Sequence, residues 1–495
     1  MGTNALQIDT RDRAVRILHI ASEAVPWAKS GGLADVVGAL CAHFATSGHD
    51  VALALPRYRD LGSVGPDVDA PSVAVPGGAG SVFQVRRAVS AAGFEVWWVD
   101  APELFDREGL YGTADGDFPD NALRFATLVR GALGATRAFD WRPDIIHAHD
   151  WQGALAPVYV KGGYEGEWGV PPATVLTIHN MAYQGVFSAG AATAAGLPES
   201  DALEQGAGVG LLKGGILSAD RVTTVSPGYA REIATPRFGF GLDAWIAGLE
   251  PPVQGVLNGI DTDTWNPQTD LFLPETYGVT DMRGKAGCKA ALQAEVGLPA
   301  GADVPLFGMV SRLVGQKGLS LIAELADDLV QRDAQFVFLG TGEPRYERLV
   351  AGLASRHPNV AARMVFSEEL AHRIEAGSDF FLMPSEFEPC GLNQMISQRY
   401  GTPPIVHRVG GLADSVTHAS PRALEAGEAT GIVFDRFDAR TLSAAVEFAR
   451  NLYAKPATLA AVRRAGMEKD FSWCRSGLEY EQLYLQLIED RNGAA

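Results

Sequence analysis

The chain has 495 residues, of which 47% are hydrophobic and 20% charged, a composition typical of a globular protein with room for two large cores. A formal net charge of −18 argues against a general nucleic-acid or anionic-membrane binder, because both need basic surfaces. The four cysteines form no CxxC motif, and no signal peptide or membrane-spanning apolar run is recognisable. We therefore expect a soluble, cytoplasmic protein that binds neither nucleic acid nor membrane.

The first half of the chain alternates short apolar runs with stretches of helical spacing. Strands are predicted at residues 17–21, 51–56, 94–99, 144–149, 174–179 and 221–225. Apolar residues recur at three- and four-residue spacing over 33–40, 122–133 and 153–160, which predicts helices. Such alternation indicates βαβ units and mostly parallel sheets.

The first predicted strand leads into the segment KSGGLAD, residues 29–35. A glycine turn between a strand and a helix presents backbone N–H groups and a helix N-terminus to an anion. Gly31 and Gly32 allow a ligand to approach the backbone closely, and Lys29 adds a positive charge. Taken alone, the segment is equally compatible with an ordinary surface turn.

An irregular region, from about residue 238 to 282, separates this half from a second one. Alternation resumes with predicted strands at 305–310, 335–339, 380–384 and 404–406. We predict an α/β fold of two Rossmann-like, doubly wound domains, residues 14–255 and 262–470, whose ligand-binding loops face a common cleft. Residues 471–495 predict a C-terminal helix that packs back on the N-terminal domain through its apolar face.

The second half begins with a cationic loop directly after its first predicted strand. Arg312 and Lys317 flank a turn into the next predicted helix. The forked guanidinium of an arginine suits a diphosphate, as does a lysine at a helix N-terminus, because a diphosphate concentrates several negative charges in a small volume. For this loop alone, a solvated turn with two incidental cations is the alternative.

Two further loops have ligand-binding chemistry. Residues 384–394, PSEFEPCGLNQ, follow a predicted strand and combine carboxylates, amides, proline and glycine. Hydroxyl-rich ligands need this mixture, because a carboxylate accepts hydrogen bonds from sugar hydroxyls and backbone N–H groups donate to them. Residues 409–414, VGGLAD, form a third glycine-pair loop ahead of a helix. Each loop alone suits a surface turn, whereas three at the same ends of two sheets favour a phosphate and sugar site.

Specific motifs then point to a family: KSGGLAD at 29–35, HAHDW at 147–151, TIHN at 177–180, LNGID at 257–261, the Arg312/Lys317 loop and FEPCGL at 387–392. Over nearly its full length the chain resembles the bacterial glycogen synthases and plant starch synthases, retaining glucosyltransferases of the GT-B type. The resemblance implies transfer of glucose from ADP-glucose to the nonreducing end of an α-1,4-glucan such as glycogen.

The resemblance also implies roles for residues of the first half. Lys29 and the amides of Gly31 and Gly32 are expected near the donor phosphates. Three residues are expected to line the cleft on the first-domain side, namely Asp35, Asp120 and Asn258. His149 matches the histidine that holds the glucosyl 6-hydroxyl and whose carbonyl group faces the anomeric carbon.

In the second half, the resemblance implies that Arg312 and Lys317 hold the diphosphate and stabilise its charge as it leaves. Glu388 is expected to contact the transferred glucose. The resemblance also implies that backbone amides lie close to the sugar hydroxyls, namely those of Cys390, Gly391, Leu392 and Asn393. Phe366 stands where relatives have a tyrosine against the adenine, so the stacking face is kept and a hydroxyl contact is lost.

The expected chemistry needs no cofactor, with ADP-glucose as a substrate. Ile396 replaces the second glutamate of the E-x7-E pattern found in other retaining transferases, and no carboxylate nucleophile is evident. We therefore expect front-face attack with the donor phosphate as base. Asp-x-Asp pairs of the kind that bind Mg²⁺ in other enzymes occur at 67/69, 115/117 and 261/263, and we interpret them as chance occurrences.

Two other functions are compatible with such a chain. A nucleotide-sugar 2-epimerase has a similar fold and needs no polymer acceptor, and a non-catalytic glucan-binding relative is the second possibility. The Lys29 loop and the FEPCGL motif argue against the epimerase. The presence of Lys29, Arg312, Lys317 and Glu388 argues against a non-catalytic protein.

Overall fold

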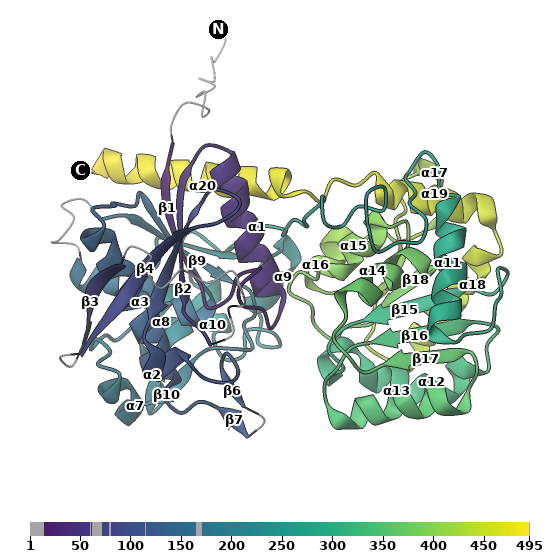
Figure 1. The fold of residues 1–495 in the computed structure, drawn as a ribbon, viewed down its shortest axis with the longest axis horizontal. Coiled ribbons are helices and arrows are strands. Elements are labelled where there is room, and N and C mark those ends of the chain that lie inside the picture. The colour runs from purple at the N-terminus through teal and green to yellow at the C-terminus, as the bar shows by residue number, and fades with distance from the viewer. Residues whose placement is uncertain are drawn as a thin grey trace, which may run out of the picture. The chain divides into compact units, whose positions relative to one another are not determined.

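The computed structural model describes residues 14–59, 61, 72–78, 81–113, 115–164 and 171–494. The chain forms two compact units (Figure 1). The first contains the described residues of Met1–Thr224, Ile233–Gln254 and Gly477–Ala495, and the second contains Val225–Glu232 and Gly255–Ser476. Residues 225–232, which we expected in the first domain, thus belong to the second unit. Among the described helices, none is both long and apolar enough to cross a membrane.

The first unit is built on a nine-stranded sheet. In order across the sheet, its strands are β14 (Gln254–Gly255), β13 (Arg221–Thr224), β9 (Ala173–Ile178), β8 (Ile145–His149), β1 (Arg16–Ile20), β2 (Asp50–Pro56), β5 (Glu95–Asp100), β4 (Ser81–Val89) and β3 (Ser72–Gly78). The pairs from β13 to β5 are parallel, and β4 and β3 are antiparallel additions. Strands β1, β2, β8 and β9 are almost wholly buried, as parallel strands covered on both faces are.

The helices of the first unit include α1 (Gly32–Thr46), α2 (Pro102–Phe105), α3 (Asn121–Ala138), α4 (Asp150–Gly153), α5 (Leu155–Tyr159), α7 (Ala189–Ala194), α8 (Leu211–Ser218) and α10 (Asp243–Ala247). Helix α3 is buried along most of its length. Short antiparallel ladders join β6 (Gly112–Thr113) to β7 (Gly116–Asp117), and β10 (Val186–Ser188) and β11 (Glu204–Gln205) to β12 (Gly208–Gly210).

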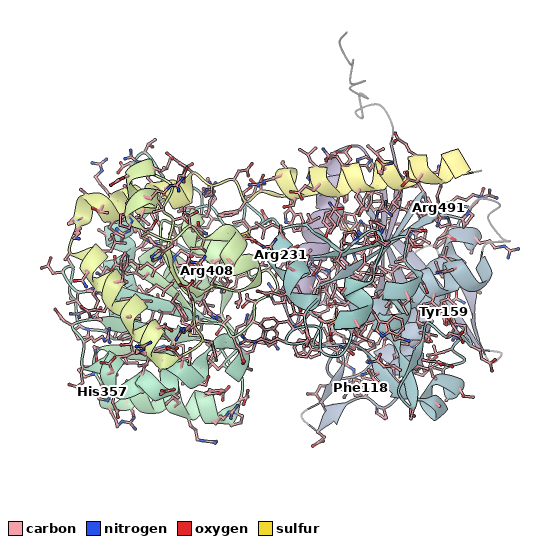
Figure 2. All side chains as sticks on the ribbon, turned by 180° about the vertical axis from the view of Figure 1, so that it is seen from behind. Phe118, Tyr159, Arg231, His357, Arg408 and Arg491 are labelled. Carbon is pink, nitrogen blue, oxygen red and sulfur yellow. The ribbon has the colours of Figure 1, made fainter. Side chains whose placement is uncertain are left out.

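The C-terminal helix α20 (Trp473–Ala494) contributes its residues from Gly477 onward to the first unit. Tyr484 is buried, and its hydroxyl lies 2.6 Å from Nδ1 of His147 in β8. Near the end of the helix, Arg491 donates to the carboxylate of Asp220 at 2.7 Å and to the carbonyl oxygen of Pro171 at 2.6 Å (Figure 2). The helix is therefore anchored by a buried aromatic group and by an arginine fork.

The second unit contains a six-stranded, wholly parallel sheet. Its strands, in order across the sheet, are β17 (Val360–Arg363), β16 (Gln335–Leu339), β15 (Leu306–Val310), β18 (Phe380–Met383), β19 (Pro404–His407) and β20 (Ile432–Phe434). In chain order this is 3-2-1-4-5-6, the order of a doubly wound Rossmann sheet. The prediction of two Rossmann-like sheets is confirmed.

Helices cover both faces of this second sheet. They are α11 (Gly284–Val296), α12 (Leu319–Val330), α13 (Pro344–Arg356), α14 (Glu368–Gly377), α15 (Asn393–Arg399), α16 (Gly410–Ser415), α17 (Pro421–Ala426), α18 (Ala439–Tyr453) and α19 (Pro456–Met467), and α9 (Pro227–Ile233) precedes them. Neighbouring residues of one strand join opposite cores: Phe307 packs with α12, α13 and α18, whereas Leu306 packs with α11 and α14. The period of two along each strand thus fills both layers.

Candidate active site

The KSGGLAD segment forms the turn between β1 and α1. Helix α1 begins at Gly32, and its N-cap Gly31 has an extended backbone, with φ −160° and ψ −167°, and no side-chain cap. A Cβ atom on Gly31 would have no atom within 4 Å among the described residues. The N–H groups of the first helical turn have no partner within the helix, and the space next to Gly31 is free of other described atoms. An anion site needs both features.

Two predicted site residues of this segment contact each other. Nζ of Lys29 lies 2.7 Å from Oδ1 of Asp35, and the two side chains are 42% and 34% exposed. An exposed ion pair contributes only ~0–1 kcal/mol, so the lysine can exchange this partner for an anionic ligand at little cost.

Glu23 fixes this segment through hydrogen bonds to Ser30, and the sequence analysis missed this residue. Its buried carboxylate accepts hydrogen bonds from the hydroxyl of Ser30, at 2.7 Å, and from the backbone N–H of Ser30. Tyr111 donates its hydroxyl to the same carboxylate. The available signal was a lone glutamate between the end of a strand and a glycine turn, which is too common a pattern to assign a function.

Asp120 precedes α3 and is paired with Arg107. The guanidinium donates to both carboxylate oxygens, at 2.8 and 2.6 Å. Both acceptor atoms that we expected to face a ligand therefore bind an arginine.

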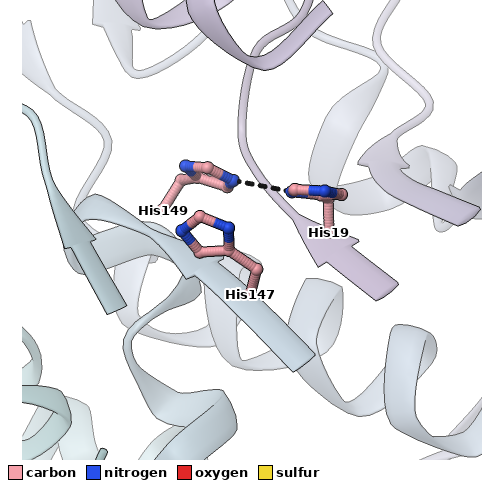
Figure 3. A group of neighbouring side chains, drawn as sticks. All are labelled: His19, His147 and His149. Atoms are coloured by element: carbon pink, nitrogen blue, oxygen red, sulfur yellow. Dashed lines mark hydrogen bonds between the residues drawn. The ribbon is translucent and has the colours of Figure 1, made fainter. Parts of the chain in front are cut away.

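A cluster of histidines lies at the carboxyl ends of β1, β8 and β9, the edge at which open α/β sheets bind ligands. His19 is the register partner of His147, and Nδ1 of His19 lies 3.1 Å from Nε2 of His149 (Figure 3). Nδ1 of His149 lies 3.0 Å from Nε2 of His179, which follows β9. The structure thus places the predicted His149 between two histidines that sequence reasoning did not connect to it.

The cluster is uncharged at neutral pH. Burial lowers the pKa of His19 and of His179 to about 3, and burial together with the neighbouring imidazoles lowers the pKa of His149 well below its usual value. Asp150 has a left-handed backbone, with φ 51°, and its carboxylate accepts from the N–H groups of His179 and Asn180. Burial nevertheless raises the pKa of Asp150 to about 7.

His19, His147 and His149 are close enough to share a metal ion. Hydrogen bonds occupy both ring nitrogens of His147, with Tyr484 and with Thr177 at 2.5 Å, and both ring nitrogens of His149. A metal ion would have to replace these bonds, because a ligating nitrogen needs a free lone pair. The cluster fits a hydrogen-bonded group of neutral imidazoles better than a metal centre.

In the second unit, Lys317 and Glu388 form a fixed pair. Nζ of Lys317 lies 2.6 Å from Oε2 of Glu388, and the two side chains are 19% and 7% exposed. The hydroxyl of Ser385 donates to the same carboxylate oxygen at 2.9 Å. The structure thus brings two predicted residues, 71 positions apart, into one group.

The loops that bear this pair are bonded to each other. Gln316 donates from its side chain to the carbonyl oxygen of Phe387 at 3.1 Å, and its own carbonyl oxygen accepts from the N–H of Glu386 at 2.8 Å. Gly318 has a φ of +80°, and a Cβ atom there would lie 2.1 Å from the carbonyl oxygen of Pro384. The close approach of the two loops therefore requires a glycine.

Arg312 and Phe366 are the exposed members of the predicted site in the second unit. The guanidinium of Arg312 makes no hydrogen bond or ion pair with another residue of the described chain. Phe366, between β17 and α14, is 81% exposed. Both side chains are accessible to a ligand.

The segment from Cys390 to Asn393 leads into α15. Gly391 has a φ of +73°, and the side chain of Gln394 donates to the carbonyl oxygens of Cys390 and Gly391, at 3.0 and 2.9 Å. These bonds fix the orientation of two peptide planes. Leu392 is the N-cap of α15, and Asn393 donates to the carbonyl oxygen of Val310 at 2.8 Å. The side chain of Asn393 therefore has a structural contact.

Asn258 differs from expectation. It belongs to the second unit, not to the first-domain side, and hydrogen-bonds to the thiol of Cys390. Burial raises the pKa of that thiol to about 12, so it is not a nucleophile. Oδ1 of Asn258 is buried and has no partner among the described residues.

The loop at 409–414 is not an open anion site. The N–H of Gly410 donates to the carboxylate of Glu232 at 2.8 Å, and the N–H of Gly411 donates to the carbonyl oxygens of Glu388 and Pro389. A Cβ atom on Gly410 would lie 2.1 Å from the Glu388 carbonyl oxygen. This glycine pair therefore packs against the loop at 384–394 instead of presenting its amides to a phosphate.

The two Asp-x-Asp pairs in the described part of the chain show no converging ligand set. Asp261 accepts from the N–H groups of Asp263 and Thr264, as in a turn, and Asp115 and Asp117 are exposed. The pair at 67/69 lies outside the described residues.

Known proteins match the chain over nearly all of its length. Residues 16–248 match the family model of the starch synthase catalytic domain, and residues 296–461 match that of group 1 glycosyl transferases. A glycogen synthase of Myxococcus xanthus is 45% identical, over 96% of this chain and 100% of its own length. Glycogen synthase 1 of Methylococcus capsulatus is 42% identical, over 97% and 98%.

A solved structure agrees with these relatives. The catalytic domain of starch synthase IV from Arabidopsis thaliana, bound to ADP and acarbose, superposes with a TM-score of 0.88 at 34% identity. The alignment covers 96% of this chain and 100% of that one. With both catalytic regions matched and full-length relatives above 40% identity, the chain belongs to the glycogen and starch synthase family of GT-B glycosyltransferases.

Proposed function

We propose that this chain transfers glucose from ADP-glucose to the nonreducing end of an α-1,4-glucan, with retention of configuration. The observation that carries the proposal is the fixed Lys317–Glu388 pair, together with an exposed arginine, Arg312, in the same loop as Lys317. Two cations suit a diphosphate, and a carboxylate suits sugar hydroxyls. The ADP and acarbose bound to the related starch synthase support an adenosine nucleotide and a glucan as the ligands.

In the second unit, Arg312 and Lys317 bind the diphosphate, and Glu388 accepts from hydroxyls of the transferred glucose. The backbone amides of residues 390–393 donate to other hydroxyls of that sugar. Phe366 stacks on the adenine, with its exposed ring as support for this role. Asn258 belongs to the same unit, and its Oδ1, which has no partner among the described residues, serves as a hydrogen-bond acceptor for the donor.

In the first unit, Lys29 and the amides of Gly31 and Gly32 act on the donor phosphates, and Asp35 releases Lys29 to them. His149 holds the glucosyl 6-hydroxyl. Asp120 has a lesser role, because its carboxylate binds Arg107 and reaches a ligand only through that arginine.

In the reaction, the bond between the anomeric carbon and the β-phosphate oxygen breaks as negative charge grows on the phosphate. The 4-hydroxyl oxygen of the glucan bonds to the anomeric carbon from the same face, and its proton passes to the leaving phosphate. Fixed cations stabilise this charge, and each contributes on the order of 3 kcal/mol to lowering the barrier. Glu388, bonded to Lys317 and Ser385, is committed as an acceptor and does not serve as nucleophile.

We expect the reaction to need no cofactor and no metal ion, and to occur in the cytoplasm. Side chains supply the positive charge that a metal ion would otherwise provide, which supports a metal-free reaction. The four free cysteines suit a reducing compartment, which supports the cytoplasm. Activity should therefore be unchanged in EDTA. Loss of activity in EDTA and its recovery with Mg²⁺ would refute the metal-free reaction.

The test of this function is a comparison of donors and acceptors with the full chain. We expect labelled glucose from ADP-glucose to enter glycogen at a higher kcat/KM than glucose from UDP-glucose, with one ADP released per glucose transferred. Without glucan, the donor should remain unaltered. Conversion of the donor's sugar in the absence of glucan would identify an epimerase instead, and glucan binding without transfer would identify a non-catalytic relative.

A further inference from the structure

Three imidazoles of the first unit form a continuous hydrogen-bonded chain. Nδ1 of His19 is bonded to Nε2 of His149, and Nδ1 of His149 is bonded to Nε2 of His179, at 3.1 and 3.0 Å (Figure 3 shows the first bond). His19 and His149 have no exposed surface, whereas His179 is 9% exposed. The chain therefore runs from the core of the sheet toward its ligand-binding edge.

Counting protons leaves two arrangements of this chain. A neutral imidazole has one N–H group, and each of the two hydrogen bonds needs one. Either all three rings carry the proton on Nδ1, or all three carry it on Nε2, because any mixture places two protons or none in one bond. The tautomers of the three rings are thus coupled.

The buried end of the chain selects one arrangement. Nε2 of His19 is buried and has no partner among the described residues. With the proton on Nε2, this N–H group would be buried without an acceptor, the most costly kind of unpaired polar group. With the proton on Nδ1, the His19 ring donates to His149, and only a lone pair lacks a partner. The Nδ1–H arrangement is therefore the more stable one.

The surroundings keep the chain separate and neutral. The ring of His147 stacks on that of His149, with centroids 4.3 Å apart, but its nitrogens bind Tyr484 and Thr177. The ring of Phe44 stacks on that of His19. Among the described residues, no cation or carboxylate is hydrogen-bonded to these three rings, and burial lowers the pKa of each ring.

We propose that His19 is a positioning residue, which through this chain holds His149 in the Nδ1–H tautomer and so makes the His149–His179 end a hydrogen-bond donor to the transferred glucose. A sugar hydroxyl that takes the place of His179 would accept from Nδ1 of His149, and one beyond His179 would accept from Nδ1 of His179. The identity of the sugar group rests on the proposed function. The tautomer rests on the geometry alone.

The tautomer can be measured directly in the full-length wild-type protein. With ¹⁵N-labelled histidine, two-bond ¹⁵N–¹H correlations distinguish a protonated Nδ1 from a protonated Nε2, and His→Asn variants assign the signals. We expect Nδ1–H for His19, His149 and His179. Nε2–H for His149 would overturn the proposal, whatever reaction the protein catalyses.

The kinetic test compares two substitutions at His19 on two donors. His19→Leu removes the N–H group, whereas His19→Asn keeps a donor close to the position of Nδ1. With ADP-glucose we expect His19→Leu to lower kcat/KM about tenfold, the effect of one hydrogen bond, and His19→Asn to recover most of it. With an ADP-6-deoxyglucose donor, the two variants should match the wild type within about twofold.

The outcomes separate this proposal from the one on which it rests. Equal losses on both donors, or no recovery with asparagine, would mean that His19 only supports the fold, and would overturn the proposal. Absence of transfer by the wild type from either donor would instead refute the proposed function, and the ¹⁵N measurement would still decide the tautomer.

Discussion

Two loops of the molecule each join a lysine to a carboxylate, and they differ in burial rather than in distance. The Lys29–Asp35 pair is 2.7 Å long and about two-fifths exposed, whereas the Lys317–Glu388 pair is 2.6 Å long and nearly buried. An exposed pair is weak and exchanges partners, but a buried pair cannot lose one member without leaving an uncompensated charge. The second-unit loop is therefore preorganised, and the first-unit loop is adaptable.

The largest effect should come from breaking the buried pair. Lys317→Ala removes a cation from the proposed diphosphate site and leaves Glu388 without its partner, so we expect kcat to fall about 10³-fold. Unfolding free energy should fall by about 3 kcal/mol, as for a buried pair that has lost one member. Steady-state kinetics and urea unfolding measure the two quantities. The matched control is Lys317→Ala combined with Glu388→Gln, which should recover stability but not rate.

The substitution Arg312→Ala tests the effect of a positive charge on the rate without an accompanying change in the free energy of unfolding. Because no described residue binds its guanidinium, we expect kcat to fall about a hundredfold while unfolding free energy changes by less than about 0.5 kcal/mol. Arg345→Ala is the control, since Arg345 is an exposed cation paired with Glu343. A rate for Arg312→Ala like that of this control would exclude Arg312 from the site.

The exposed pair should matter less and depend on salt. We expect Lys29→Ala to lower kcat/KM about tenfold at low ionic strength and by a smaller factor at 0.5 M salt, where exposed charges are screened. Asp35→Asn frees the lysine and should leave stability unchanged. Kinetics at two salt concentrations test this. A loss from Lys29→Ala as large and salt-independent as that from Lys317→Ala would contradict the contrast between the loops.

Asp150, a buried carboxyl group with no cationic partner among the described residues, completes the comparison, and its substitution should have the smallest effect on rate. Burial raises the pKa of Asp150 to about 7, so the folded state binds a proton that the unfolded state has already released above pH 4. Unfolding free energy should therefore decrease as pH rises from about 4 to 7. Asp150→Asn should flatten this slope in urea unfolding across that range. An unchanged slope would show that other groups cause it.

The fold was largely predictable because short, continuous apolar runs alternate with stretches of helical spacing. The predicted strand at 335–339 is β16, and that at 17–21 overlaps β1. Weak elements escaped prediction: β17 has four residues, VAAR, and the hairpin of β3 and β4 continues the sheet with antiparallel strands that contain glycine and charged residues. Such strands are specified by their neighbours, which local pattern does not reveal.

The motifs predicted candidate site residues, but not what those residues contact. The Lys317–Glu388 pair joins positions 71 residues apart, and His19 and His149 are 130 apart. Arg107, which binds Asp120, and Glu232, which binds the amide of Gly410, belonged to no motif. Partners of this kind depend on register and on loop packing. For the same reason, similar glycine pairs at 31–32 and 410–411 proved to have different environments.

The most direct test of the central claim is a crystal structure of the protein with ADP. We expect the diphosphate oxygens within about 3 Å of the Arg312 guanidinium and of Nζ of Lys317, with the Lys317–Glu388 bond intact. A diphosphate bound away from both cations, or a Lys317 that abandons Glu388 to reach it, would contradict a preorganised second-unit site.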